Sequence, residues 1–158
     1  MFPCKKILCP TDFSESSAKA IRAAFTLAEK VGAELTLVHV ADALPMNRHL
    51  SGRVCKNAEK DIVTNVPFDV SEYMEKRKAD ALRKLWKEVG NFEKGSVKSS
   101  ILVVEGNAVS EILNVATEMN ADLILMAESG ESKGRHPFLR TVTQGVAQCA
   151  PISVMIFR

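Results

Sequence analysis

The residues best suited to hold a ligand lie between Leu123 and Thr141. The apolar run from Leu123 to Met126 predicts a buried strand, and a polar loop that contains Gly130 follows it. A helical pattern then opens at Leu139. Unpaired N–H groups at the start of a helix, together with the positive end of the helix dipole, attract phosphate. The order of strand, glycine-bearing loop and helix start therefore predicts a nucleotide site.

Other chemistries fit this loop less well. A Walker-type phosphate loop requires four residues between its glycines and then a lysine, whereas Gly130 and Gly134 enclose three residues and precede Arg135. Ser129 follows a strand as a hydrolase nucleophile would, but no glycine pair flanks it and no histidine is placed as its base. The three histidines show no metal-ligand spacing. We therefore expect no catalytic residue and no metal site.

The composition narrows the class of protein. A chain of 158 residues with 46% hydrophobic and 25% charged residues suits one globular domain over residues 1–158. Its 21 basic and 19 acidic residues are too evenly balanced to predict a nucleic-acid partner. No apolar run approaches the roughly 20 residues that span a bilayer, and no signal peptide is recognisable, so we expect no membrane partner. The four cysteines lack C-x-x-C spacing and predict reduced thiols in a cytoplasmic protein, three of them in or beside apolar segments.

Strand-like and helix-like patterns alternate along the chain. Strands are expected at Ile7–Cys9, Leu35–Val40, Val97–Val104, Leu123–Met126 and Ile152–Phe157. Helices are expected after Ser14 as far as Gly32, from Val70 to Gly90, after the cap Asn107, and from Leu139 with Val142, Val146 and Cys149 facing inward. Residues 41–69 read as a long, variable surface loop.

This alternation predicts an α/β fold with a five-stranded parallel sheet and helices on both faces, doubly wound in the strand order 3-2-1-4-5. The winding direction reverses between the first and fourth strands, and ligands bind outside the carboxyl ends of strands at such a point. Pro10, Thr11 and Asp12 end the first strand, and Ala127 to Gly130 follow the fourth. Two segments distant in sequence are therefore expected to form one crevice.

Motifs on both sides of this crevice resemble the universal stress protein family over essentially the whole chain. They are the runs Lys6–Ser14 and Val38–Val40 and the loop and helix from Ala127 to Val142. Nucleotide-binding members carry G-x2-G-x9-G-[S/T]; here the spacing is kept but two glycines are replaced, giving Ala127, Gly130, Arg140 and Thr141. The resemblance implies ATP as the ligand. It places Thr11, Asp12 and Val40, with Pro10 beside them, at the adenine and ribose, and it places Ala127, Gly130, Arg140, Thr141, Val142 and Thr143 at the phosphates.

Arg140 is the most consequential departure from that pattern. Its long side chain occupies space that glycine leaves open for close approach of phosphate to the helix start. A guanidinium also binds phosphate in a bidentate manner, so Arg140 either blocks the site or replaces lost backbone contacts. Ala127 is tolerable unless its backbone requires positive φ. Glu128 adds negative charge at the same end of the crevice.

Several candidate residues also have structural interpretations. Asp12 is either a ligand contact or the cap of the first helix, and Thr141 either meets phosphate or caps the last helix, two compatible roles. His39 in an apolar strand is typical of a hydrogen-bonded core histidine. Gly145, inside the last helix, is explained by close packing as well as by function.

The sequence thus favours a non-enzymatic regulatory protein with a weakened ATP site. The alternative is a nucleotide-free module of the same fold that works through dimerisation and protein contacts. The resemblance implies a homodimer through strand 152–157, which is apolar and expected at the sheet edge, where an unpaired strand favours association. An ATP-hydrolysing enzyme is the third interpretation.

Overall fold

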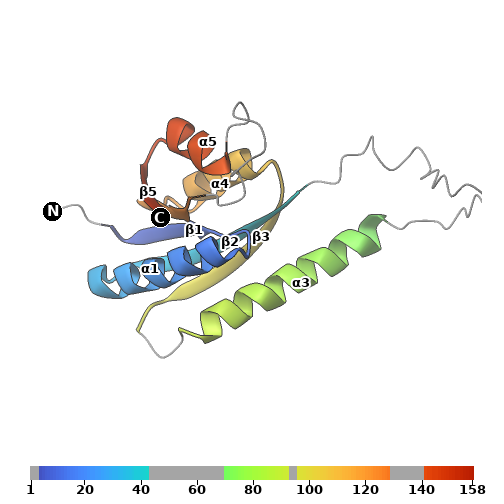
Figure 1. The fold of residues 1–158 in the computed structure, drawn as a ribbon, viewed down its shortest axis with the longest axis horizontal. Helices are drawn as coiled ribbons and strands as arrows, with labels where there is room; N and C mark the ends of the chain where they lie inside the picture. Colours follow the sequence, from blue (N-terminus) through green and yellow to red (C-terminus); the bar gives the residue numbers. More distant parts are fainter. Residues whose placement is uncertain (1–3, 43–69, 93–95, 129–140) are drawn as a thin grey trace, which may run out of the picture.

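The computed structural model describes residues 4–42, 70–92, 96–128 and 141–158, and its centre is a five-stranded sheet. All strand pairs are parallel, and the strand order is β3-β2-β1-β4-β5. The predicted fold class and strand order are confirmed (Figure 1). The strands are β1 (Lys6–Pro10), β2 (Glu34–Asp42), β3 (Ser99–Gly106), β4 (Leu123–Ala127) and β5 (Ser153–Phe157).

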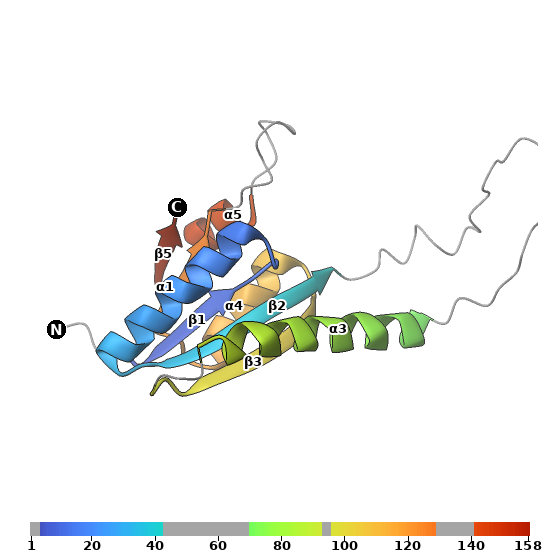
Figure 2. The same ribbon diagram turned by 60° about the horizontal axis from the view of Figure 1, so that its bottom comes forward.

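Helices cover both faces of the sheet. Helices α1 (Glu15–Val31) and α3 (Val70–Gly90) lie on one face, and α4 (Ala108–Glu118) and α5 (Val142–Cys149) lie on the other (Figures 1 and 2). Each face has its own buried cluster because neighbouring residues of a strand point to opposite sides. Ile7 and Cys9 of β1 belong to the α1 side, whereas Leu8 belongs to the α4 side. No helix in the described ranges is long and apolar enough to cross a membrane.

The helix ends follow the predicted capping signals. Ser14 caps α1 by accepting a hydrogen bond from the Ser17 N–H, and Asn107 caps α4 through the Ser110 N–H. Gly32 ends α1 with φ of 68°, a left-handed conformation that glycine adopts without steric cost. These caps fix where each helix begins relative to the strand before it, and hence the shape of the carboxyl edge of the sheet.

Two predictions about α5 are wrong. Val146 is fully buried as expected, but Val142 is 36% exposed and Cys149 is also exposed. Both residues stand at the ends of a helix of only eight residues, where fewer neighbouring side chains cover them. Helical periodicity alone does not show where coverage stops. The other two described cysteines are more enclosed: Cys4 is half-buried and Cys9 fully buried, and burial raises the pKa of Cys9 to about 12.

Candidate functional site

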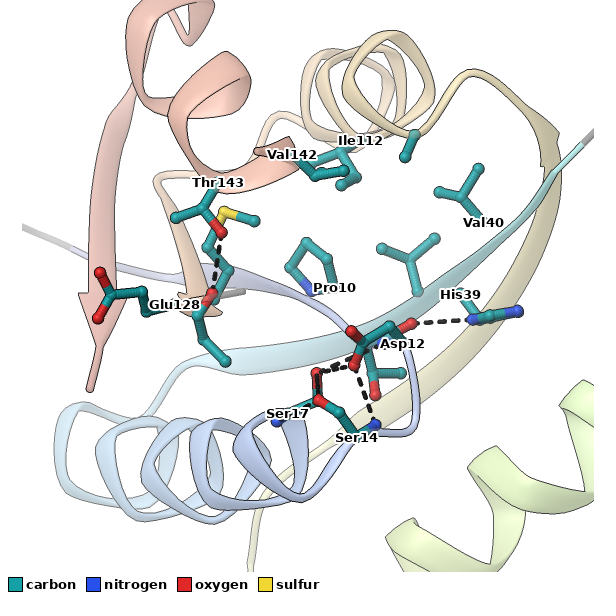
Figure 3. Close-up of a pocket in the computed structure, with 15 residues that line it drawn as sticks. Pro10, Asp12, Ser14, Ser17, His39, Val40, Ile112, Glu128, Val142 and Thr143 are labelled. Atoms are coloured by element: carbon teal, nitrogen blue, oxygen red, sulfur yellow. Dashed lines mark hydrogen bonds between the residues drawn. The ribbon is translucent and has the colours of Figure 1, made fainter. Parts of the chain in front are cut away.

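A pocket opens at the carboxyl ends of β1 and β4, where the sheet order reverses (Figure 3). The two predicted segments do converge there. The predicted site residues that line the pocket are Pro10, Thr11, Asp12, Val40, Ala127, Val142 and Thr143. Thr141 lies at the start of α5 without lining the pocket. Gly130, Arg140 and the predicted loop 41–69 lie outside the described residues.

Asp12 stands at the α1 side of the pocket with half of its carboxylate engaged. Its Oδ1 accepts hydrogen bonds from the Ser14 N–H at 2.9 Å and from the Ser17 hydroxyl at 2.5 Å. Both of these bonds go to Oδ1, so neither uses Oδ2. Ser14 is the N-cap of α1, so the alternative in which Asp12 caps this helix is wrong. The Asp12 carboxylate instead accepts a hydrogen bond from the N–H of the capping residue.

The environment of Asp12 favours its ionised form. Partial burial works to raise the pKa of its carboxyl group, but the hydrogen bonds from Ser14 and Ser17 outweigh burial and hold the pKa below its ordinary value. At neutral pH the pocket therefore carries a fixed negative charge with one oxygen able to accept a hydrogen bond. Amino or hydroxyl donors, such as those of a nucleoside, suit this oxygen better than phosphate does.

Thr11 holds the backbone next to Asp12. Its N–H donates to the Val38 carbonyl at 2.9 Å, and its side-chain oxygen accepts from the Phe13 N–H at 3.1 Å. The Thr11 carbonyl accepts from His39 Nδ1 at 2.9 Å. Thr11 is 6% exposed, so its polar groups are committed to shaping the turn. The predicted hydrogen bond of His39 is confirmed, but the prediction of a core histidine is wrong, because His39 is half-buried and lines the pocket.

The opposite side of the pocket is formed by β4 and the start of α5. Thr141 and Gln144 make a reciprocal capping box: the Thr141 side chain accepts from the Gln144 N–H, and the Gln144 side chain accepts from the Thr141 N–H. The Thr143 hydroxyl, 4% exposed, donates to the Ala127 carbonyl at 3.1 Å. Both hydroxyls therefore serve the fold, and the capping role of Thr141 is confirmed.

Close packing also fixes this side. A Cβ atom on Gly145 would lie 2.8 Å from Val109 Cγ2, so the absence of a side chain lets α5 approach α4.

Glu128 lines the pocket, but its carboxylate points away from the other lining residues (Figure 3). It lies 3.4 Å from Arg158 in an exposed ion pair. The negative charge of Glu128 is therefore at this end of the pocket, but it faces Arg158 at the C-terminus and not the pocket interior.

Sequence reasoning missed part of the lining. The unpredicted members are Ser14, Ser17, Val38, His39, Ala108, Ile112 and Met126, whereas Glu128 was expected at the crevice as a negative charge. Val38 and Ile112 are buried and, together with Val40, supply an apolar surface; Val40 lies across the pocket from Thr143 and Glu128 (Figure 3). Ile112 carried a signal, because it lies on the apolar face of α4. Within the described residues no group of His, Cys, Asp or Glu side chains could hold a metal ion.

Comparison with known proteins gives a consistent set of similarities. The profile of the universal stress protein family matches residues 3–51 and 56–158. Universal stress protein MJ0531 of Methanocaldococcus jannaschii is 29% identical over 159 residues, covering 98% of this chain and 82% of that protein. Universal stress protein YxiE of Bacillus subtilis is 29% identical over 154 residues, covering 97% and 98%.

Solved structures with low sequence identity share the fold. UspA from Lactobacillus plantarum aligns with a TM-score of 0.73 at 20% identity, covering 98% of this chain and 97% of that one. A universal stress protein in complex with cAMP gives 0.66 at 19% identity, covering 98% and 97%. A universal stress protein from Archaeoglobus fulgidus in complex with dAMP gives 0.63 at 16% identity, covering both chains fully.

Proposed function

The chain belongs to the universal stress protein family, and we propose that it is a non-enzymatic, cytoplasmic regulatory protein that binds an adenine nucleotide in the pocket between β1 and β4. The observation that carries the proposal is the pairing of the Asp12 carboxylate with an apolar surface at the reversal point of the sheet. The complexes of two relatives with cAMP and dAMP support an adenine ligand.

The two sides of the pocket suggest an orientation for that ligand. Asp12 Oδ2 suits the amino group of adenine or a ribose hydroxyl, and Val40 and Ile112 offer apolar contact to the base. The phosphates would then lie toward Val142, where the positive end of the α5 dipole favours anions. Nucleoside recognition thus falls to the β1 side and phosphate recognition to the α5 side.

Direct binding measurements test this proposal. Calorimetry with ATP, ADP, AMP and adenosine should show binding of all four, and GTP serves as the control for base recognition. The ultraviolet absorbance ratio of the freshly purified protein and of its denatured extract should reveal any nucleotide carried through purification. No heat with any adenine compound at millimolar concentration would reject the proposal. ATP recovered unchanged after prolonged incubation with the protein would support the absence of hydrolysis.

A substitution at Arg140 tests whether this side chain blocks the phosphate groups or binds them. If its side chain fills their space, Arg140→Gly should strengthen ATP binding, because the backbone can approach the ligand. If the guanidinium holds phosphate, the same change should weaken ATP binding and remove most discrimination between ATP and AMP. Adenosine is the matched ligand control, because its affinity should not change in either case.

A homodimer through β5 is the assembly we propose alongside nucleotide binding. β5 ends the sheet, and Met155, Ile156 and Phe157 are 45%, 41% and 37% exposed. An apolar edge strand with unpaired backbone groups favours association with a second copy. This surface would remain in use if the protein bound no nucleotide.

Matched edge variants test the dimer. Ile156→Lys should yield a monomer by sedimentation at micromolar concentration, because it places a charge in the proposed interface. Leu102→Lys, which changes a residue of similar exposure on β3 at the other edge, should leave the dimer intact. A wild-type protein that sediments as a monomer would reject this assembly.

A further inference from the structure

Phe13, directly after Asp12, has an unusual backbone conformation. Its φ of 64° lies in the left-handed region, which is costly for a bulky side chain. Such conformations persist where the surrounding structure holds them, and they concentrate at functional sites. The contacts around Phe13 therefore identify what holds the turn that presents Asp12.

Phe13 packs against the hydrophobic cluster on the α1 side of the sheet and makes three further contacts. Its N–H donates to the Thr11 side chain at 3.1 Å, and its ring lies against the His39 ring with centroids 4.4 Å apart. Lys84 of α3 places its Nζ 5.1 Å from the centroid of the same ring, within the range of a cation–π contact. Phe13 is thus contacted from the turn after β1, from β2 and from α3.

His39 acts on both sides of Asp12. A carbonyl oxygen only accepts hydrogen bonds, so the 2.9 Å contact requires that His39 Nδ1 carry a proton and donate to Thr11, the residue before Asp12. The same imidazole packs against Phe13, the residue after Asp12. One half-buried side chain therefore sets the backbone on either side of the carboxylate, which leaves Asp12 exposed at the pocket (Figure 3).

We infer that His39 is a positioning residue for ligand binding, which acts with Phe13 to orient the Asp12 carboxylate toward the pocket, and that Lys84 of α3 supports this arrangement through the Phe13 ring. The inference rests on the proposed nucleotide site and adds residues that need not touch the ligand. Core packing of the Phe13 side chain favours this conformation as well, and the His39 contacts add a brace on both sides of Asp12.

Two substitutions at His39 separate positioning from packing. His39→Leu removes the donor to the Thr11 carbonyl and should weaken AMP binding by about five- to tenfold, the loss expected when one hydrogen bond no longer orders a contact residue. His39→Asn keeps an N–H donor near the Nδ1 position and should restore most of the affinity. An unchanged dissociation constant in His39→Leu, or no recovery in His39→Asn, would overturn the inference.

A spectroscopic measurement without nucleotide separates this inference from the proposed function. The Ser14 amide donates to Asp12 Oδ1, so its proton resonance and exchange protection report where the carboxylate points. Both should change in His39→Leu and return in His39→Asn. If the wild type binds no nucleotide, the proposed function fails, and the Ser14 amide still decides whether His39 positions Asp12; an unchanged amide in His39→Leu would overturn the inference.

Surface variants of α3 provide a test that does not risk the fold. Lys84→Gln should weaken AMP binding by about two- to threefold, in line with an exposed cation–π contact, and should shift the Ser14 amide in the same direction as His39→Leu. Arg83→Gln is the matched control, because Arg83 pairs with Asp80 on the same helix and should change neither measurement. Equal effects of the two variants would show that Lys84 does not support the position of Asp12, and would overturn that part of the inference.

Discussion

Both sides of the pocket contain a helix start that is capped by a hydroxyl group, but they leave different polar groups available to a ligand. At each side a hydroxyl caps a helix, Ser14 on α1 and Thr141 on α5. On the α1 side a separate residue, Asp12, supports the cap with one oxygen and turns the other toward the pocket. On the α5 side the Thr141 oxygen accepts from the Gln144 N–H and the Thr143 hydroxyl donates to the Ala127 carbonyl, so both side chains take part in the fold.

The two sides of the pocket therefore differ in how much their contacts to a ligand would depend on other parts of the chain. Under the proposed function, the α1 side would contact the nucleoside through the Asp12 carboxylate, which the fold itself holds in place. The α5 side would meet the phosphates at the helix start. We therefore expect recognition of the nucleoside to be robust to changes on the α5 side, and discrimination among phosphates to depend on that side.

The largest expected effect is the loss of nucleotide affinity in Asp12→Ala. Removing the carboxylate should weaken binding of AMP and adenosine by about tenfold or more, because a charge-assisted contact to the nucleoside is lost. The free energy of unfolding should fall by only about 1–2 kcal/mol, since Ser14 still caps α1. Calorimetry and urea unfolding on the same samples measure the two effects. Unchanged affinity for AMP and adenosine would contradict the assignment of nucleoside recognition to the α1 side.

Gly145→Ala should distort the α5 side alone. The new Cβ would lie 2.8 Å from a methyl group of Val109, so Val109 or α5 must shift, at a cost of about 1–2 kcal/mol after the better helix propensity of alanine is counted. AMP should lose more affinity than adenosine, because the start of α5 moves. Adding Val109→Ala makes room for the methyl group and should recover most of the stability. Failure of the double variant to recover would show that something other than Val109 requires glycine.

Thr141→Ala should affect stability more than binding. Loss of the cap costs about 1 kcal/mol, whereas Thr141→Ser keeps a capping oxygen and should cost far less. Because Thr141 caps α5 through Gln144 and does not line the pocket, AMP affinity should fall by no more than about twofold. Thermal unfolding and calorimetry check both values. A tenfold loss of affinity in Thr141→Ala with normal affinity in Thr141→Ser would instead assign this hydroxyl to the phosphate.

The sequence predicted the fold because its signals were local and mutually consistent. Five apolar runs, separated by capped or glycine-terminated helical patterns, permit few arrangements other than a doubly wound parallel sheet. The α1 side of the site was predicted as far as Pro10, Thr11 and Asp12, because they directly follow a recognisable strand. The inward-facing prediction failed at Val142 and Cys149, where the helix ends.

What the sequence could not supply were relations between distant residues. His39 meets the Thr11 carbonyl because β1 and β2 pair with Pro10 opposite Val38, a register that no local pattern in either strand specifies. Ser17 reaches Asp12 only because the chain turns at Phe13 with positive φ, and nothing in the types of these residues predicts that conformation. Gly145 was correctly linked to close packing, but its partner Val109 came only from the structure.

The smallest expected effect is a pH dependence that belongs to Asp12. Its pKa in the folded protein lies below the value of about 3.9 expected for an unfolded chain, so its stabilising contribution is complete above that value and is lost as pH falls toward the lower, folded-state pKa. Glu34 and Asp122 also have lowered pKa values, through Lys98 and through the backbone N–H groups of Lys5 and Lys6 respectively, so the wild type alone cannot identify the source.

Asp12→Asn isolates this contribution, because its side-chain oxygen still accepts from Ser14 and Ser17 but does not ionise. The difference in unfolding free energy between wild type and Asp12→Asn should stay constant from pH 7 to about pH 5 and narrow below about pH 4. Thr141→Ala, which changes the uncharged cap on the other side, should differ from the wild type by the same amount at every pH. A difference that is constant to pH 3 for both variants would mean that the charge of Asp12 does not stabilise the α1 side.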